Sequence, residues 1–265
     1  MKKILFWALT IIITVVSAYY QRQTGPTKPV ESDVIIADQK IEFSLRRSFH
    51  RPADAPVAID VPDETIEGYF RYKKYPSHDD WDTLNLVRTD NQLIAYIPQQ
   101  PAAGKVNYQI VLQKGDKKVK LTEYPVTIRF RNDVPAWAMI PHILLMFAAM
   151  LFSNRAAIAA IGREKTYTYV LLTFITFVGG GLIFGPIVQK YAFGDWWTGW
   201  PFGTDLTDNK TAFAFIFWIV ALFKTKNNPY HRTWVVVAAL ILLAIYFIPH
   251  SLLGSEIDWT QEAIQ

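Results

Sequence analysis

Two histidines lie in nearly identical hexapeptides, Ile-Pro-His-Ile-Leu-Leu at 140–145 and Ile-Pro-His-Ser-Leu-Leu at 248–253. Both hexapeptides belong to long apolar segments, where an ionisable or ligating side chain is rare and often functional. If the two segments form facing helices, His142 and His250 could supply the axial imidazoles of a b-type haem. A haem between these two residues is therefore the first candidate chemistry.

Methionines near the first histidine offer a second chemistry. Met139, His142, Met146 and Met150 follow one another at intervals of three, four and four residues, which places all four side chains on one face of a helix. Thioether and imidazole groups suit copper, so Met139, His142, Met146 and His250 are candidate metal ligands. A methionine stripe is also typical of ordinary helix packing, and both interpretations stay open.

A segment rich in tryptophan and aspartate, residues 189–210, separates two apolar runs. Its interspersed glycines and proline favour a loop that lies in the membrane interface or re-enters it. Together with the two histidines, its polar residues could relay protons, bind a small polar ligand, or serve only as helix caps and ion pairs. The residues concerned are Asp195, Trp196, Trp197, Trp200, Asp205, Asp208 and Lys210.

The composition argues against several classes of function. The 265-residue chain has no cysteine, which excludes disulfides, thiol catalysis and thiolate metal sites. Its net charge of +4 forms no basic block, so we do not expect nucleic acid as a partner. No phosphate-binding glycine loop, Gly-x-Ser-x-Gly elbow or zinc-protease spacing occurs, and the sequence gives no reason to expect an enzyme.

Five apolar runs would position these side chains. Hydrophobic residues make up 51% of the chain and charged residues 19%, with most of the charge in 21–133. A hydrocarbon core of about 30 Å needs roughly 20 helical residues, so we expect an α-helical membrane bundle of about five spans with the lipid bilayer as a partner. The runs are Leu5–Tyr20, Ala136–Phe152, Tyr169–Val188, Thr211–Phe223 and Thr233–Leu253.

Positive residues beside the apolar runs set the expected orientation. They place the N-terminus inside, and the region 21–135, the segment 189–210 and the C-terminal tail outside. Both histidines then share one depth near the outer boundary, beside the tryptophan-rich segment. This orientation predicts a multi-pass protein of a bacterial-type inner membrane. The residues that carry the bias are Lys2, Lys3, Arg155, Arg163, Lys165, Lys224, Lys226 and Arg232.

The same patterns divide the chain into parts. The first apolar run is either a retained anchor or a signal peptide, because Val16-Ser17-Ala18 resembles a signal-peptidase site. The expected parts are an N-terminal segment 1–20, a linker 21–33, a β domain 34–133, a four-span helical domain 134–254 and a tail 255–265.

The region between the first two apolar runs has short alternating runs separated by turn residues, which predicts an extracytoplasmic all-β sandwich. Along 91–112, Ala-x-Ile-Pro closes one strand, Gln-Pro-Ala-x-Gly turns, and Val-x-Tyr-x-Ile opens the next. This pattern resembles the hairpin of bacterial immunoglobulin-like or fibronectin-type-III-like domains, and the resemblance covers 34–130. It implies a fold and no particular catalysis. The inward positions would be Leu93, Ala95, Ile97, Val106, Tyr108 and Ile110.

Two functions follow as competing expectations. The leading one is a binding or assembly module that engages an envelope protein through its β domain. The aromatic residues Tyr69, Tyr72, Tyr75 and Trp81 could form a partner surface there, or pack as ordinary surface and core aromatics. The other is a membrane redox or metal protein that holds haem or copper at His142 and His250.

Overall fold

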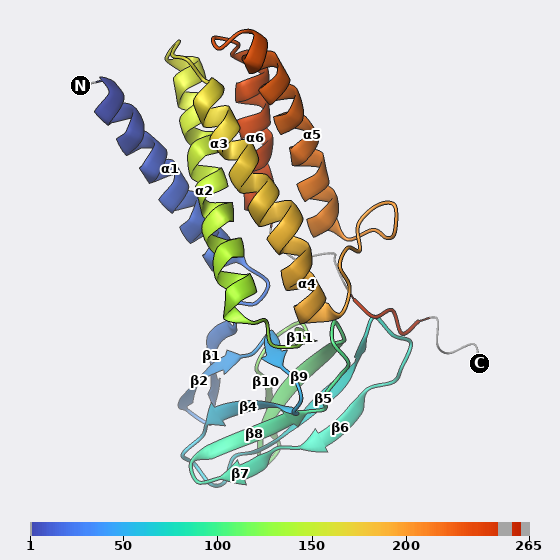
Figure 1. Cartoon of the computed structure of the whole chain (residues 1–265). Helices are drawn as coiled ribbons and strands as arrows, with labels where there is room; N and C mark the ends of the chain where they lie inside the picture. The colour runs from blue at the N-terminus through green and yellow to red at the C-terminus, as the bar shows by residue number, and fades with distance from the viewer. Residues whose placement is uncertain (1, 249–255, 261–265) are drawn as a thin grey trace. The chain divides into compact units, whose positions relative to one another are not determined.

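The computed structural model describes residues 2–248 and 256–260. The chain forms two compact units (Figure 1). A helical unit contains Met1–Pro26 and Val134–Gly254, and a β unit contains Thr27–Asp133 and Ser255–Gln265. Each unit therefore combines segments that are far apart in the sequence.

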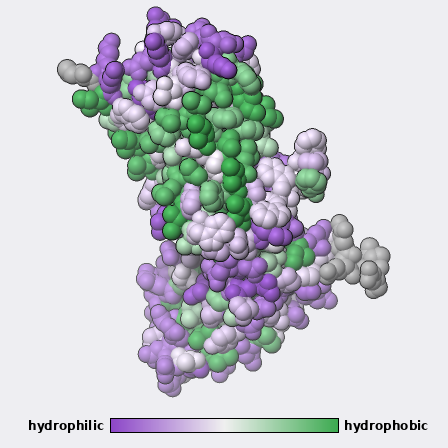
Figure 2. Space-filling model, in the orientation of Figure 1, coloured by the Kyte–Doolittle hydropathy of each residue, from purple (hydrophilic) through white to green (hydrophobic). Residues whose placement is uncertain are grey.

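Among the described residues, four helices are long and apolar enough to cross a membrane, which indicates a membrane protein. Figure 2 shows a band of hydrophobic residues over the visible face of this unit. In chain order the helices are α1 (Lys2–Thr24), α2 (Ala136–Ile161), α3 (Tyr167–Phe177), the π-helix η1 (Val178–Phe184), α4 (Gly185–Phe193), α5 (Leu206–Asn227) and α6 (Thr233–Phe247). The α3–η1–α4 run is continuous and forms one of the four candidate spans, whereas α6 is shorter than the others.

Helix α1 extends further than its apolar run predicted. It runs to Thr24, whose Oγ1 donates to the Tyr20 carbonyl oxygen and continues the last turn past the apolar residues. The first strand begins at Val30. The expected linker 21–33 was therefore wrong at both ends.

The loop expected at 189–210 is also shorter than predicted. Helix α4 continues to Phe193 and α5 begins at Leu206, so Asp208 and Lys210 are helical and the loop covers 194–205. The early start of α5 has a local cause, because the Asp205 carboxylate accepts hydrogen bonds from the backbone N–H groups of Thr207 and Asp208.

The helical unit has one strongly basic end. The start of α1, the α2–α3 turn and the α5–α6 turn lie together there, and the loop between α4 and α5 lies at the opposite end (Figure 1). The cations carried by the basic end are Lys2, Lys3, Arg163, Lys165, Lys224, Lys226 and Arg232.

The strands of the β unit are β1 (Val30–Ile36), β2 (Gln39–Leu45), β3 (Ser48–His50), β4 (Ala55–Asp60), β5 (Glu67–Tyr75), β6 (Asp82–Asn85), β7 (Val87–Thr89), β8 (Gln92–Ile97), β9 (Lys105–Lys114), β10 (Lys117–Lys120) and β11 (Val126–Arg131). One sheet has the order β3-β11-β9-β5-β6, with β10 also paired to β9. A second sheet has the order β4-β8-β7, and β1 pairs with β2. The β3–β11 pair is parallel, and the other described pairs are antiparallel.

One hydrophobic core joins these sheets. It includes Ile41 of β2, Ile59 of β4, Phe70 of β5 and Phe130 of β11, each at most 3% exposed. The inward positions predicted from the β8–β9 hairpin are confirmed, because Leu93, Ala95, Ile97, Val106, Tyr108 and Ile110 are all buried. Alternation along the strands was therefore a sufficient guide to this part of the core.

The C-terminal residues 256–260 pack on the β unit. The Glu256 carboxylate forms an ion pair with Lys105 at the start of β9. The Trp259 backbone N–H donates to the Pro76 carbonyl oxygen at 3.1 Å, just after β5. The chain thus returns to the β unit after the last helix.

Candidate functional site

His142 is held by the backbone of the π-helix. Its Nδ1 lies 2.9 Å from the carbonyl oxygen of Gly180 in η1. A carbonyl only accepts, so Nδ1 carries the proton and Nε2 of the neutral ring keeps its lone pair. This is the arrangement by which a second partner orients a ligating imidazole.

Glycine makes this contact between α2 and η1 feasible. A Cβ added at Gly180 would lie 2.9 Å from the Met146 backbone nitrogen and 3.0 Å from the Leu145 Cβ. Small residues let membrane helices approach this closely. The π-helical turn itself was not predicted. Such turns interrupt the regular hydrogen-bond ladder and are frequent at functional sites.

The methionine stripe takes part in helix packing. Met150 is buried, Met139 and Met146 are half-buried, and the Met146 carbonyl oxygen accepts a 2.6 Å hydrogen bond from the Tyr246 hydroxyl of α6. Among the described residues, no three or more histidines or carboxylates lie close enough to hold a metal ion. His250 lies outside the described residues.

Asp208 ties the loop between α4 and α5 to the start of α5. Its carboxylate accepts from the backbone N–H groups of Thr198 at 2.6 Å and Gly199 at 3.0 Å, and from Gln189 Nε2 at 3.1 Å. The neighbouring Asn209 side chain accepts from the Trp200 N–H at 2.7 Å. The middle of the loop, residues 198–200, is therefore bound to the first turn of α5.

Three large aromatic side chains project from this fixed loop. The exposed fractions are 56% for Trp196, 78% for Trp200 and 82% for Phe202. Trp197 is half-buried and its indole N–H donates to the Trp200 carbonyl oxygen at 3.1 Å. We call residues 194–204 the aromatic loop. Rigid, exposed aromatic residues beside a span suit a membrane interface.

The predicted polar cluster forms in part. Asp205 and Asp208 meet at Thr198, whose hydroxyl lies 3.1 Å from an Asp205 carboxylate oxygen. Lys210 is buried, and its ammonium donates to the Ile248 carbonyl oxygen at 2.8 Å, where a cation stabilises the end of α6. Asp195 is exposed on the aromatic loop. In the described part of the chain, His142 bonds to Gly180 and joins none of these groups.

Arg155 is a buried site that the sequence did not reveal. It was expected to lie between two spans as an orientation charge, but it lies within α2 and is 1% exposed. Its guanidinium carbon lies 4.4 Å from the Tyr169 ring centroid and 5.5 Å from that of Trp7, and Nη2 pairs with Glu164 at 2.8 Å. The next residue back, Asn154, donates to the Thr14 hydroxyl of α1 at 3.0 Å. Two buried polar residues of α2, Asn154 and Arg155, therefore have interaction partners on α1.

The β unit carries a basic surface. In the β5–β9 register Tyr69 lies opposite Val111 and Arg71 opposite Gln109, so one face of the sheet collects the outward residues of β5, β9, β10 and β11. We call this the basic face. Its charged residues are the cations Arg71, Lys73, Lys105, Lys118, Lys120, Arg129 and Arg131 and the acid Glu67.

Aromatic rings lie among these cations. Arg71 and Lys73 lie over the Trp81 ring at 5.4 and 5.6 Å from its centroid, and Lys118 lies over Tyr69 at 5.7 Å. Arg71 is also oriented by a 2.7 Å hydrogen bond from Nη2 to Gln109 Oε1. Of the aromatic residues predicted as a partner surface, Tyr69, Tyr75 and Trp81 are partly or fully exposed, and Tyr72 packs against the core.

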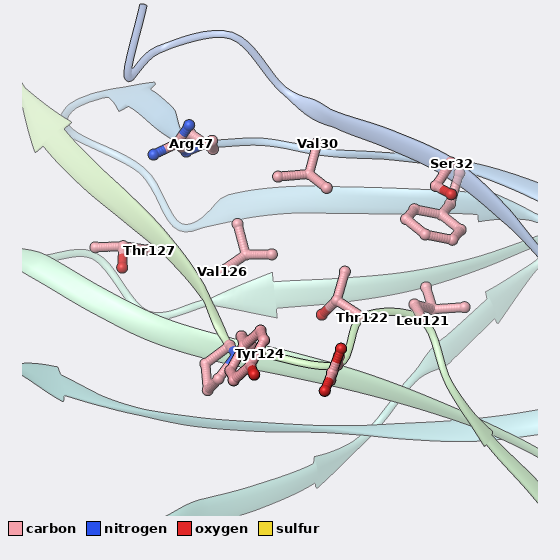
Figure 3. Close-up of a pocket in the computed structure, with 11 residues that line it drawn as sticks. Val30, Ser32, Arg47, Leu121, Thr122, Tyr124, Val126 and Thr127 are labelled. Atoms are coloured by element: carbon pink, nitrogen blue, oxygen red, sulfur yellow. The ribbon is translucent and has the colours of Figure 1, made fainter. Parts of the chain in front are cut away.

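A groove of about 480 Å³ lies between the β1–β2 hairpin and the turn before β11 (Figure 3). Val30 and Ser32 line one side, and Thr122 and Tyr124 the other. Its charged lining residues are Arg47 and Glu123, which are opposite in sign. The groove therefore has no evident preference for an anion or a cation.

No known protein family matches the chain, and neither a curated protein nor a solved structure is similar to it.

Proposed function

We propose that this protein is a membrane-anchored binding or assembly module of a bacterial-type inner membrane, whose extracytoplasmic β unit engages an envelope protein. The basic face is the observation that supports this function best. It combines cations with aromatic rings, whereas the charged groups at the start of α5 are already engaged in local hydrogen bonds.

The position of the C-terminal residues supports a fifth span. Residues 256–260 pack on the β unit, which the chain enters after α1 and leaves before α2. The exit of the chain before α2 and its return at residue 256 must lie on one side of the membrane. The segments between these two points, α2 to α6, must therefore cross the membrane an even number of times. Three of those segments are candidate spans, and α6 supplies the fourth crossing.

Charge at the ends of the helices supports the orientation. The basic end of the helical unit would face the cytoplasm, as the distribution of Lys and Arg favours. The aromatic loop would then lie at the outer boundary. The N-terminus would be inside, and the β unit and the C-terminus outside.

Contacts of α1 favour a retained anchor over a cleaved signal peptide. Removing α1 would leave the Asn154 amide without its acceptor, the Thr14 hydroxyl, and would remove the cation–π contact between Arg155 and the Trp7 ring. Losing the partners of buried polar groups is costly in a membrane.

The strand order supports the immunoglobulin-like interpretation of the β unit. Such sandwiches pack two mainly antiparallel sheets against each other and join them through Greek-key connections, so that many neighbours within a sheet are not consecutive in the chain. The orders β3-β11-β9-β5-β6 and β4-β8-β7 fit that plan. The β1–β2 hairpin is an addition to it.

Cysteine labelling in spheroplasts tests the proposed function, because the chain has no native cysteine. A membrane-impermeant maleimide photo-crosslinker is expected to label Gln113→Cys on the basic face and to capture a discrete partner after illumination. Tyr96→Cys, exposed on the opposite sheet, should label without capture. Lys224→Cys at the basic end should label only after lysis. Equal capture from both sheets, or labelling of Lys224→Cys in intact spheroplasts, would contradict the proposal.

A redox or metal site remains the second candidate, and the hydrogen bond from His142 to Gly180 favours it by leaving Nε2 available. If haem binds, the purified protein should show a Soret band that His142→Ala and His250→Ala each abolish. His78→Ala, an exposed histidine of the β unit, should leave the band unchanged. A featureless spectrum and the absence of copper by elemental analysis would rule out both cofactors.

A further inference from the structure

If the β unit is a binding module, the residues that already occupy its basic face indicate what it binds. Residues 256–260 lie at the end of the sheet where β5 ends and β9 begins, and they reach the basic face at Lys105. They belong to the same unit as the face. The chain therefore supplies its own example of a peptide bound there.

Three kinds of interaction hold this peptide. The Glu256 carboxylate pairs with the Lys105 ammonium. The Lys74 ammonium, on the opposite side of the end of β5 from Lys73, lies 4.3 Å from the centroid of the Trp259 ring, which is close for a cation–π contact. The Trp259 backbone N–H donates to the Pro76 carbonyl oxygen at 3.1 Å.

The described part of the bound peptide carries two acidic side chains, Glu256 and Asp258. Hydrogen bonds from the Thr260 hydroxyl and backbone N–H to the Asp258 carboxylate, with the nearby His78, hold the pKa of Asp258 below its usual range. Asp258 is thus ionised at neutral pH, and the peptide presents two carboxylates beside an indole ring.

Most of the basic face extends beyond the residues that contact this peptide. Arg71 and Lys73 lie over the Trp81 ring, and Arg71 Nε is buried without a hydrogen-bond partner among the described residues. Lys118 and Lys120 are exposed on β10, which lies across β9 from β5. Guanidinium and ammonium groups arranged in this way suit carboxylates of an extended acidic segment.

We propose that the basic face, together with the adjoining end of β5 that carries Lys74, binds an acidic, tryptophan-bearing peptide segment of a partner protein, and that residues 256–260 of the chain compete for one end of the same site. The intramolecular peptide then limits binding to partners that can displace it. Its effective concentration is high because it is tethered to the same chain.

Fluorescence anisotropy with the full-length protein in detergent tests this competition. The probe is the fluorescein-labelled peptide Ser-Glu-Ile-Asp-Trp-Thr-Gln-Glu, which has the sequence of residues 255–262. The double variant Glu256→Gln, Trp259→Ala should bind it about tenfold more tightly than the wild type, because the tethered competitor is weakened. Adding Arg71→Gln to the double variant should weaken binding about fivefold. Lys40→Gln, which removes the same charge from the β1–β2 hairpin, should have no effect.

Two results would overturn the proposal. One is equal affinity of the wild type and the double variant for the acidic peptide. The other is equal affinity of the double variant for a probe in which glutamine and asparagine replace the acids. If either occurs while crosslinking still captures a partner from the basic face, the binding module stands and its partner has different chemistry.

Discussion

Replacing Asp208 with alanine is expected to release the aromatic loop from α5. The Asp208 carboxylate accepts hydrogen bonds from Thr198 N, Gly199 N and Gln189 Nε2, and Asp208 itself is buried. Removing an acceptor from buried donors costs about 1–3 kcal/mol for each donor left unsatisfied. We expect the loop to lose about 3 kcal/mol of its folded-state stability, which is enough to make the released form abundant.

A spin label at Thr204→Cys measures this release. Thr204 is exposed, and the chain has no other cysteine to label. The Asp208→Ala spectrum should show fast motion and Asp208→Asn an intermediate state, since an amide oxygen keeps part of the acceptor capacity. Asp195→Ala, an exposed aspartate on the same loop, is the matched control and should leave the spectrum unchanged. A slow spectrum for Asp208→Ala would show that other contacts hold the loop.

Replacing Arg155 with alanine should have the largest effect on the helical unit. The change removes a fully buried guanidinium from the rings of Phe6, Trp7 and Tyr169 and from Glu164. Cation–π contacts are worth about 0.5–2 kcal/mol each, and breaking a buried pair costs about 3–5 kcal/mol. We expect a loss of about 3 kcal/mol and weaker docking of α1 on α2.

Disulfide formation between Thr14→Cys and Asn154→Cys reports on that docking, because the two side chains are 3.0 Å apart in a chain without native cysteine. The yield of the α1–α2 disulfide, and the melting temperature in detergent, should fall in the Arg155→Ala background. Arg155→Lys should be intermediate, since an ammonium keeps the charge but lacks the planar stacking surface. Arg163→Ala removes an exposed cation at the same end of the unit and should change neither quantity. An unchanged yield in Arg155→Ala would mean that α1 docks without the aromatic contacts.

The pattern of hydrophobic residues was enough to predict the two kinds of structure in this chain. Long apolar runs identified the candidate spans, because a span is set by composition over many residues. Strict alternation identified the hairpin formed by β8 (Gln92–Ile97) and β9 and gave its inward residues. The three-residue strand β3 was missed, because its parallel pairing with β11 depends on residues about eighty positions away.

The candidate site was less predictable, because its features depend on which helices pack together. The sequence placed His142 on a helix, but its bond to Gly180 requires the approach of a π-helix from another segment. Asp205 and Asp208 were expected near each other, and they are joined through Thr198. In the sequence, Arg155 looks like one of the positive residues near span ends that set the orientation of a membrane protein. Its burial comes from α1 and α3, which lie far from it in the chain.

The ion pair between Lys105 and Glu256 joins residues 151 positions apart. Its lysine is translated before α2, and its glutamate emerges only after α6. Under the orientation proposed above, the pair forms during biosynthesis only after α2 to α6 have been inserted and residue 256 has reached the side of the membrane that holds the β unit. Closure of the 256–260 peptide on the β unit would then report that all of these segments have been inserted, whereas a chain halted midway would leave Lys105 without its carboxylate partner.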